Sequence, residues 1–248
     1  MRRWIGILPA SFLVSILIAG IANAAPTPKT VGNPGTAIEL FRNSHSTAIA
    51  ALIKYHGLQK ANESDKTLVA TCWMYAQYCE CNKPGKPMLW RIEKGLTKMF
   101  AGRGYPNTAI KERARYARND SETAGWEKYT EAIDGSRPVI LTFCYDASAK
   151  GDLAQARRRV SNCTSMLGIG YVTHTSKHYL ICHDGIPAGQ SHPASVARDS
   201  RASVDRVTPA SIGLSRSSGV WSQAGTSIYK WDGAYTNLVM VFAGKPTR

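Results

Sequence analysis

Up to residue 133, apolar residues recur at intervals of three and four, which is the spacing of one helix face. The predicted helices span residues 36–55, 66–78, 88–100 and 126–133. In the first helix, Ser44 or Ser46 is suited to cap the start, because a serine hydroxyl can accept from a free backbone N–H. Gly57 is suited to end it. Residues 105–118 are basic and polar, and no strand is predicted there.

After Pro138 the pattern changes to short apolar runs rich in β-branched residues. The predicted strands span residues 139–143, 166–172, 179–182, 227–231 and 238–242. Only residues 173–177 separate the second strand from the third, which is typical of a β-hairpin. Residues 186–219 are rich in Ser, Ala and Arg and are predicted to form a long loop. Helices first and strands second, without alternation, predict an α+β fold.

The first 24 residues have the organisation of a secretory signal peptide. Arg2 and Arg3 precede an apolar run over residues 5–21, and residues 22–24 form a small-x-small cleavage site. An uncleaved anchor is the alternative, since about 17 apolar residues can span a thin bilayer. We expect cleavage, which gives a secreted or periplasmic protein without a membrane span. The chain then divides into a signal peptide (1–24), an extended leader (25–35) and a single domain (36–248).

Composition and charge exclude some classes of protein. With 44% hydrophobic residues the chain is a globular protein and not a disordered one. Its formal charge is +14, and cleavage removes two arginines and no acidic residue, which leaves +12. Basic clusters at residues 113–118 and 157–159 are not interleaved with aromatic residues, so nucleic acid is not expected as a partner. Such clusters are expected to be solvated faces or to give affinity for an anionic cell-envelope surface.

All the cysteines follow the predicted cleavage site, namely Cys72, Cys79, Cys81, Cys144, Cys163 and Cys182. An even number in an exported chain predicts up to three disulfides. The favoured pair is Cys144 with Cys163, because these residues bracket a polar insert and a link would tie its two ends together. Cys72 can pair with Cys79 or Cys81. A zinc site at Cys79 and Cys81 is the alternative, but no second close Cys/His pair follows, so no metal or cofactor is predicted.

Three stretches resemble the papain-like cysteine peptidase superfamily, in particular its bacterial streptopain-like and double-glycine-leader-peptidase-like branches. Residues 46–57, Ser-Thr-Ala-Ile-Ala-Ala-Leu-Ile-Lys-Tyr-His-Gly, resemble the first helix of these enzymes, which begins at the nucleophile. Residues 126–143 resemble the helix, turn and strand that enter the sheet. Residues 165–184 resemble the hairpin that carries Gly-x-Gly-Tyr and ends in Asp or Asn. The resemblance implies a papain-like fold, with helices packed on an antiparallel sheet, and a peptide or protein as substrate or ligand.

The resemblance also assigns site positions, and most of them carry altered residues. It places the nucleophile on Ser44, the histidine on Thr164 and the orienting acid on Asp184. The glutamine of the oxyanion hole falls on Ile38. Such enzymes need a cysteine thiolate beside an imidazole, whereas a serine hydroxyl without a base is not activated at neutral pH. A non-catalytic or weakened relative that keeps a peptide-binding cleft is therefore predicted.

Other functions remain open. Residues 71–76, Thr-Cys-Trp-Met-Tyr-Ala, resemble the run around the nucleophile of papain, so an active cysteine peptidase could use Cys72 with His178 and Asp184. Cys72 also fits a buried helix position with no reactivity. Ser44 paired with the adjacent His45 is a further candidate, although neighbouring helix residues point in different directions. A third function class is a disulfide-stabilised basic protein that binds anionic surfaces.

Overall fold

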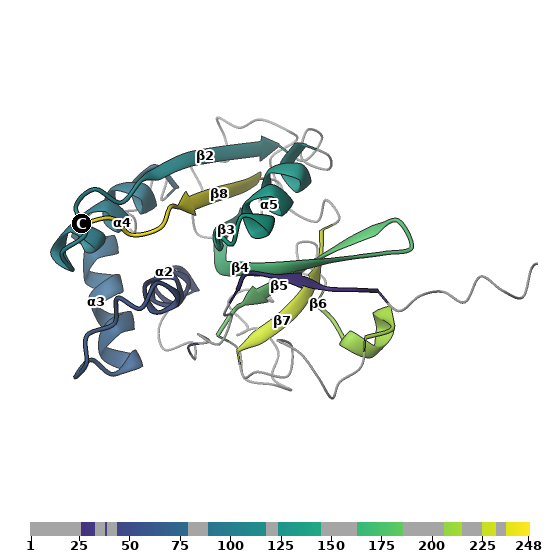
Figure 1. Cartoon of the computed structure of the whole chain (residues 1–248), viewed down its shortest axis with the longest axis horizontal. Helices are drawn as coiled ribbons and strands as arrows, with labels where there is room; N and C mark the ends of the chain where they lie inside the picture. Colours follow the sequence, from purple (N-terminus) through teal and green to yellow (C-terminus); the bar gives the residue numbers. More distant parts are fainter. Residues whose placement is uncertain are drawn as a thin grey trace, which may run out of the picture.

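The helical segments of residues 44–55, 65–78 and 89–102 lie at one end of the molecule, and that of residues 124–134 lies beside the central strands (Figure 1). The computed structural model describes residues 26–32, 38, 44–78, 89–117, 124–144, 163–185, 206–214, 225–231 and 237–248. The helices are α2 (Ser44–Tyr55), α3 (Asp65–Tyr78), α4 (Leu89–Gly102), α5 (Ala124–Asp134) and the 3-10 helix η3 (Pro209–Ile212). The strands are β1 (Lys29–Thr30), β2 (Ile110–Ala117), β3 (Val139–Cys144), β4 (Cys163–His174), β5 (Lys177–His183), β6 (Arg206–Val207), β7 (Thr226–Lys230) and β8 (Asn237–Ala243). The predicted α+β class is confirmed.

All the strands of the described regions join one antiparallel sheet in the order β2-β8-β3-β4-β5-β7-β6, with β1 paired to β4. The long strand β4 pairs with β3 through its first half and with β1 near its middle, and β5 lies along its other edge. A bulge at Gly168–Gly170 separates these two parts of β4. The predicted hairpin is therefore confirmed, and it forms the centre of the sheet.

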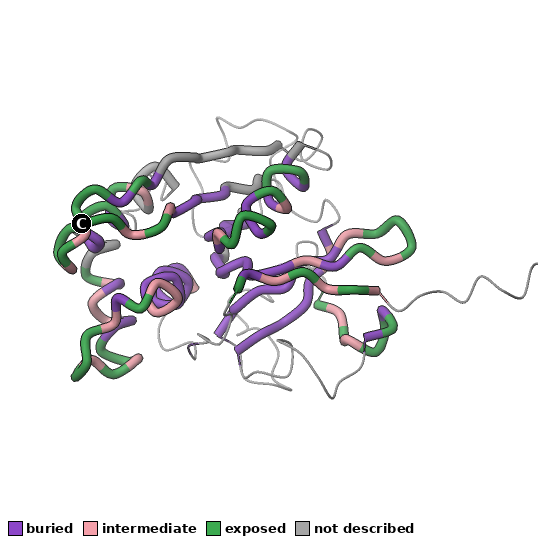
Figure 2. The backbone as a smooth tube through the Cα atoms, in the orientation of Figure 1, coloured by how far each residue is buried: buried purple, intermediate pink, exposed green. Residues whose placement is uncertain are grey.

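Helix α2 is the central helix of the molecule. Its residues from His45 to Ile53 are all buried, and Figure 2 shows this helix buried along nearly its whole length. It packs against β4 and β3 on one side and against α3 on another. A helix that is apolar around its circumference can be stable in water only when other elements enclose it. The helix ends as predicted, with Gly57 in the left-handed conformation at φ 67°.

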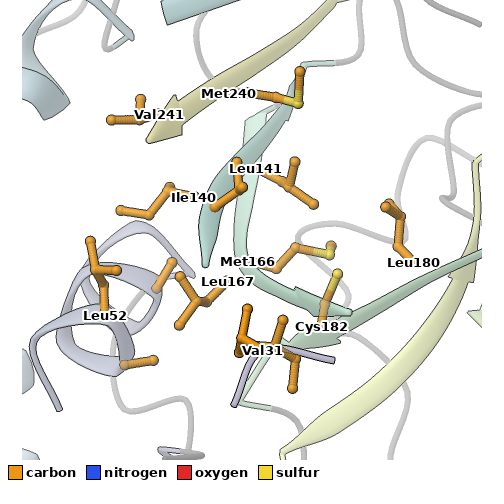
Figure 3. Packing of buried hydrophobic residues seen from close by; sticks show 14 of the residues in the cluster. Val31, Leu52, Ile140, Leu141, Met166, Leu167, Leu180, Cys182, Met240 and Val241 are labelled. Atoms are coloured by element: carbon orange, nitrogen blue, oxygen red, sulfur yellow. The ribbon is translucent and has the colours of Figure 1, made fainter. Parts of the chain in front are cut away.

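The core lies on both faces of the central strands (Figure 3). Ile140 and Leu167 face Leu52 of α2, whereas Leu141 and Met166 lie on the opposite face of the sheet. All five side chains are at most 1% exposed. Strands that are covered on both faces have continuous apolar runs, which explains why residues 139–143 and 166–172 lack a polar alternation.

The Gly-x-Gly-Tyr segment of β4 accommodates two close neighbours. A Cβ at Gly168 would lie 2.6 Å from Cε2 of Tyr129, and a Cβ at Gly170 would lie 2.4 Å from the carbonyl oxygen of Lys29. Tyr129 of α5 is fully buried, and its hydroxyl donates to the carbonyl oxygen of Gly170 at 2.7 Å. Both positions therefore need glycine because a helix side chain and a strand approach the β4 backbone directly.

Three features differ from the sequence-based predictions or extend them. The polar stretch within residues 105–118 forms the edge strand β2, which pairs with β8 along its length. Part of the leader forms β1, and Val31, the residue that follows this strand, is fully buried. The stretch 186–219 contains β6 and η3, although much of it lies outside the described residues. The signal peptide also lies outside them. None of the described helices is long and apolar enough to cross a membrane.

Candidate functional site

The first turn of α2 meets the beginning of β4. Ser44 is the first residue of α2, and its Oγ accepts a hydrogen bond of 3.0 Å from the backbone N–H of Ser165. This N–H belongs to the peptide that joins Thr164 to Ser165. Ser44, which the resemblance assigns to the nucleophile position, thus contacts the residue that follows Thr164, the assigned histidine position, although the two are far apart in the sequence. Ile38, at the glutamine position, is buried at 2% exposure.

A chain of buried polar groups lies directly beneath this junction. Nδ1 of His45 lies 2.5 Å from Oγ of Ser165, and this oxygen lies 2.6 Å from Oγ1 of Thr142 on the neighbouring strand β3. Thr142 and Ser165 are register partners in the sheet, so both side chains face α2. The three residues are at most 9% exposed. The imidazole of His45 is therefore bonded to Ser165 and not to its sequence neighbour Ser44.

Burial sets the protonation state of this imidazole. Loss of solvation lowers the pKa of His45 to about 4, so the ring is neutral at pH 7. A neutral ring can accept from Ser165 or donate to it, depending on its tautomer. Among the described residues, no imidazole or carboxylate hydrogen-bonds to Oγ of Ser44. The Ser44 hydroxyl consequently lacks the base that would make it a nucleophile.

Asp184 is held by a tyrosine. It follows His183, the register partner of Leu167 on β4, and it is buried at 3% exposure. The hydroxyl of Tyr229 donates to Oδ2 of Asp184 at 2.5 Å. Burial, and then the nearby Asp184 carboxylate, raise the pKa of Tyr229 well above its ordinary value, so the phenol keeps its proton. The carboxylate at the orienting position is thus hydrogen-bonded to a phenol.

The structure does not bring Cys72 and His178 together. Cys72 is a fully buried free thiol on α3, which packs against α2 and α4. Burial raises the pKa of this thiol far above its ordinary value, which leaves it unreactive. His178 lies on β5 beside the hairpin turn and stacks on Trp126 of α5 with ring centroids 4.4 Å apart. Figure 1 shows α3 and the hairpin turn at opposite ends of the molecule. Cys72, His178 and Asp184 therefore do not form one site.

The cysteines are not all paired in disulfides. Cys72 and Cys182 are free thiols in the core, so the six cysteines do not form three disulfides. Cys79 and Cys81, the expected partners of Cys72 and the alternative zinc site, lie outside the described residues. Within the part of the chain that is described, no group of three or more His, Cys, Asp or Glu side chains could hold a metal ion.

The buried polar chain was missed by sequence reasoning because its members are distant in the sequence. His45 and Ser165 are 120 residues apart. One signal was present, since Thr142 interrupts the apolar run of residues 139–143. A buried polar residue in a central strand needs a hydrogen-bond partner, and the neighbouring strands β3 and β4 place Thr142 opposite Ser165.

A scan against protein-family models and a search of curated proteins returned no match for this sequence.

Proposed function

We propose that this protein is an exported, non-catalytic relative of the papain-like cysteine peptidases, which binds a peptide or protein segment where α2 meets β4. One observation carries the proposal, namely the hydrogen bond from the peptide between Thr164 and Ser165 to Oγ of Ser44. In papain-like peptidases the nucleophile begins the central helix and the histidine begins the facing strand. Ser44 and Thr164 hold these two positions in the sequence resemblance.

The arrangement of the elements supports the same family. The central helix α2 begins at Ser44 and is enclosed by the sheet and by α3. Helix α5 is followed by a turn and β3, and the β4–β5 hairpin carries the Gly-x-Gly-Tyr segment. These are the three stretches on which the resemblance rests, and both α2 and α5 pack against β3 and β4.

The chemistry of the junction supports binding without hydrolysis. A serine hydroxyl needs a base within hydrogen-bond reach to attack a peptide at neutral pH. The nearby imidazole of His45 is bonded to Ser165, and threonine cannot act as a base at position 164. The start of α2 nevertheless keeps its positive dipole end and holds no acidic residue in its first turn, which favours the carbonyl oxygens of a bound peptide.

Binding is tested with a panel of immobilised peptides. We expect wild-type protein to retain a subset of them and Ser44→Trp to lose this binding, because the indole would fill the junction. Met74→Trp is the matched control, since Met74 is 52% exposed on α3 and its substitution fills no buried position. Equal binding by both variants would overturn the proposed site. Salt-sensitive retention on anionic vesicles without any peptide binding would instead support a basic surface-binding protein.

Catalysis is tested with casein and with covalent probes. We expect no hydrolysis by the wild type, no labelling by a thiol-specific probe on the native protein, and no labelling by a fluorophosphonate. Wild-type labelling that Cys72→Ala abolishes would show an active cysteine peptidase. Fluorophosphonate labelling that Ser44→Ala or Ser165→Ala abolishes would show a serine hydrolase.

A further inference from the structure

The last rung of the β3–β4 ladder consists of two cysteines. Cys144 ends β3, Cys163 begins β4, and the two residues are register partners. Residues that stand directly opposite each other in an antiparallel pair have Cα atoms about 4.5 or 5.5 Å apart, depending on the pair type. A disulfide requires Cα atoms roughly 4.4–6.8 Å apart. The register of Cys144 opposite Cys163 is therefore compatible with a disulfide between the two strands.

The other described cysteines lack such an arrangement. Cys72 and Cys182 are free and buried in the core, on α3 and β5. Burial raises the pKa of each thiol, and a protonated, enclosed thiol does not enter exchange reactions. Within the described part of the chain, only Cys144 and Cys163 stand opposite each other in the sheet.

We propose that Cys144 and Cys163 form a cross-strand disulfide in the exported protein and that it clamps the strand pair beside the α2 junction. In its formation both thiols lose their protons, one S–S bond forms, and two electrons pass to the disulfide of an exported thiol–disulfide oxidoreductase, which becomes a dithiol. The inference depends on the predicted export and is independent of whether the junction binds a peptide.

The position of this rung gives the disulfide a specific role. Two rungs further along the same ladder, Thr142 faces Ser165, whose side chain bonds to His45 and whose N–H bonds to Ser44. Strand β3 ends and β4 begins at this cysteine rung. A covalent link at this point holds the start of β4 in register whatever the conformation of the insert. It thereby keeps the Ser165 peptide against the start of α2.

The disulfide is tested first by peptide mapping of exported protein that has been blocked with N-ethylmaleimide and digested with trypsin in denaturant. We expect the peptides of residues 129–150 and 160–177 to be recovered as one linked species, which reduction separates. Recovery of both peptides with blocked cysteines would overturn the proposal. So would a link from either cysteine to Cys79 or Cys81. Neither outcome depends on the peptide-binding experiment, so a failure here is distinguishable from a failure of the proposed function.

A thermal-unfolding cycle is the second test. For a closed loop on the order of 15–20 residues, loss of the link should lower the unfolding temperature by roughly 6–12 °C. Cys144→Ala, Cys163→Ala and the double variant should show the same decrease, because each removes the same bond. Reductant should lower the unfolding temperature of the wild type and leave the double variant unchanged. Decreases that add between the single variants, or a wild type insensitive to reductant, would contradict the disulfide.

Discussion

Gly168→Ala should destabilise the protein strongly, because the new methyl group would overlap with a buried tyrosine. Its Cβ would lie 2.6 Å from Cε2 of Tyr129, 2.7 Å from the hydroxyl of the same ring and 2.9 Å from Cδ1 of Leu141. Carbon atoms in favourable contact are about 3.5–4.0 Å apart, so the ring must move by about 1 Å. Tyr129 is fully buried and donates to the carbonyl oxygen of Gly170, and this movement would break that hydrogen bond.

The two costs set the expected magnitude. Overpacking of a close-packed core costs roughly 1–3 kcal/mol, and a buried phenol without its acceptor costs roughly 1–3 kcal/mol more. We expect Gly168→Ala to lower the free energy of unfolding by about 3 kcal/mol, measured by urea denaturation with circular dichroism. Gly32→Ala is the matched control, since a Cβ there would meet nothing within 4 Å, and its effect should be close to zero.

A double-mutant cycle identifies the cause. Tyr129→Leu shortens the side chain that the new methyl group would meet, so the cost of Gly168→Ala should be smaller by at least about 1 kcal/mol in this background. Additive losses would refute the proposed overlap. A change below about 0.5 kcal/mol for Gly168→Ala in the wild-type background would refute the whole argument, because surface substitutions without a specific mechanism have effects of that size.

Three further predictions concern the ion pair of Glu63 with Arg103, the buried imidazole of His56 and the turn of the β4–β5 hairpin. Glu63→Gln should lower the free energy of unfolding by about 3 kcal/mol at pH 7, because Glu63 and Arg103 form two hydrogen bonds of 2.8 Å and are at most 9% exposed. Hydrogen bonding to Arg103 lowers the pKa of Glu63, so the wild type should lose the stabilisation from this ion pair as the pH falls below 4.5. An equal loss of stability in Glu63→Gln over the same pH range would contradict this role of the ion pair. His56→Phe should raise stability by about 1 kcal/mol at pH 7, since Nε2 is buried and finds no partner among the described residues. Burial lowers the pKa of His56 from 6.5 to about 4, so the wild type takes up a proton on unfolding between these pH values. Its free energy of unfolding should therefore decrease as the pH falls through this range. Urea titrations should show a shallower decrease for His56→Phe. Thr175→Asn with Ser176→Gly should raise the unfolding temperature by about 2–4 °C, because both residues have positive φ, 46° and 62°, which Asn-Gly adopts more readily. A decrease would show that the native turn side chains make contacts elsewhere.

The helices and central strands were predictable because local patterns specify them. Helix α2 begins at Ser44, whose Oγ accepts from Ser165 on β4, and Ser64 accepts from the N–H of Thr67 at the start of α3. The edge strand β2 was missed, because its sequence is polar and basic and has no apolar run. Its strand conformation comes from pairing with β8, which lies more than 100 residues further along the chain. The local sequence of residues 110–117 gives no indication of that pairing.

The candidate site was only partly predictable for the same reason. The resemblance pointed to Ser44 and Thr164, and the fold places Ser44 against Ser165, the residue after Thr164. It did not identify the chain from His45 through Ser165 to Thr142, which depends on the side of α2 that faces the sheet. Nor could it determine that Cys72 and His178 lie apart, since that separation follows from how the helices pack.

From the sequence alone, the α+β class and the main helices and central strands could be determined, because each depends on residue type or on local spacing. Tertiary structure decided which polar groups meet. The imidazole of His45 is neutral and bonded to Ser165 because β4 and α2 enclose it, and Cys144 stands opposite Cys163 because β3 and β4 pair in one register. Burial and register are properties of segments that are distant in the chain, and only the folded molecule brings those segments together.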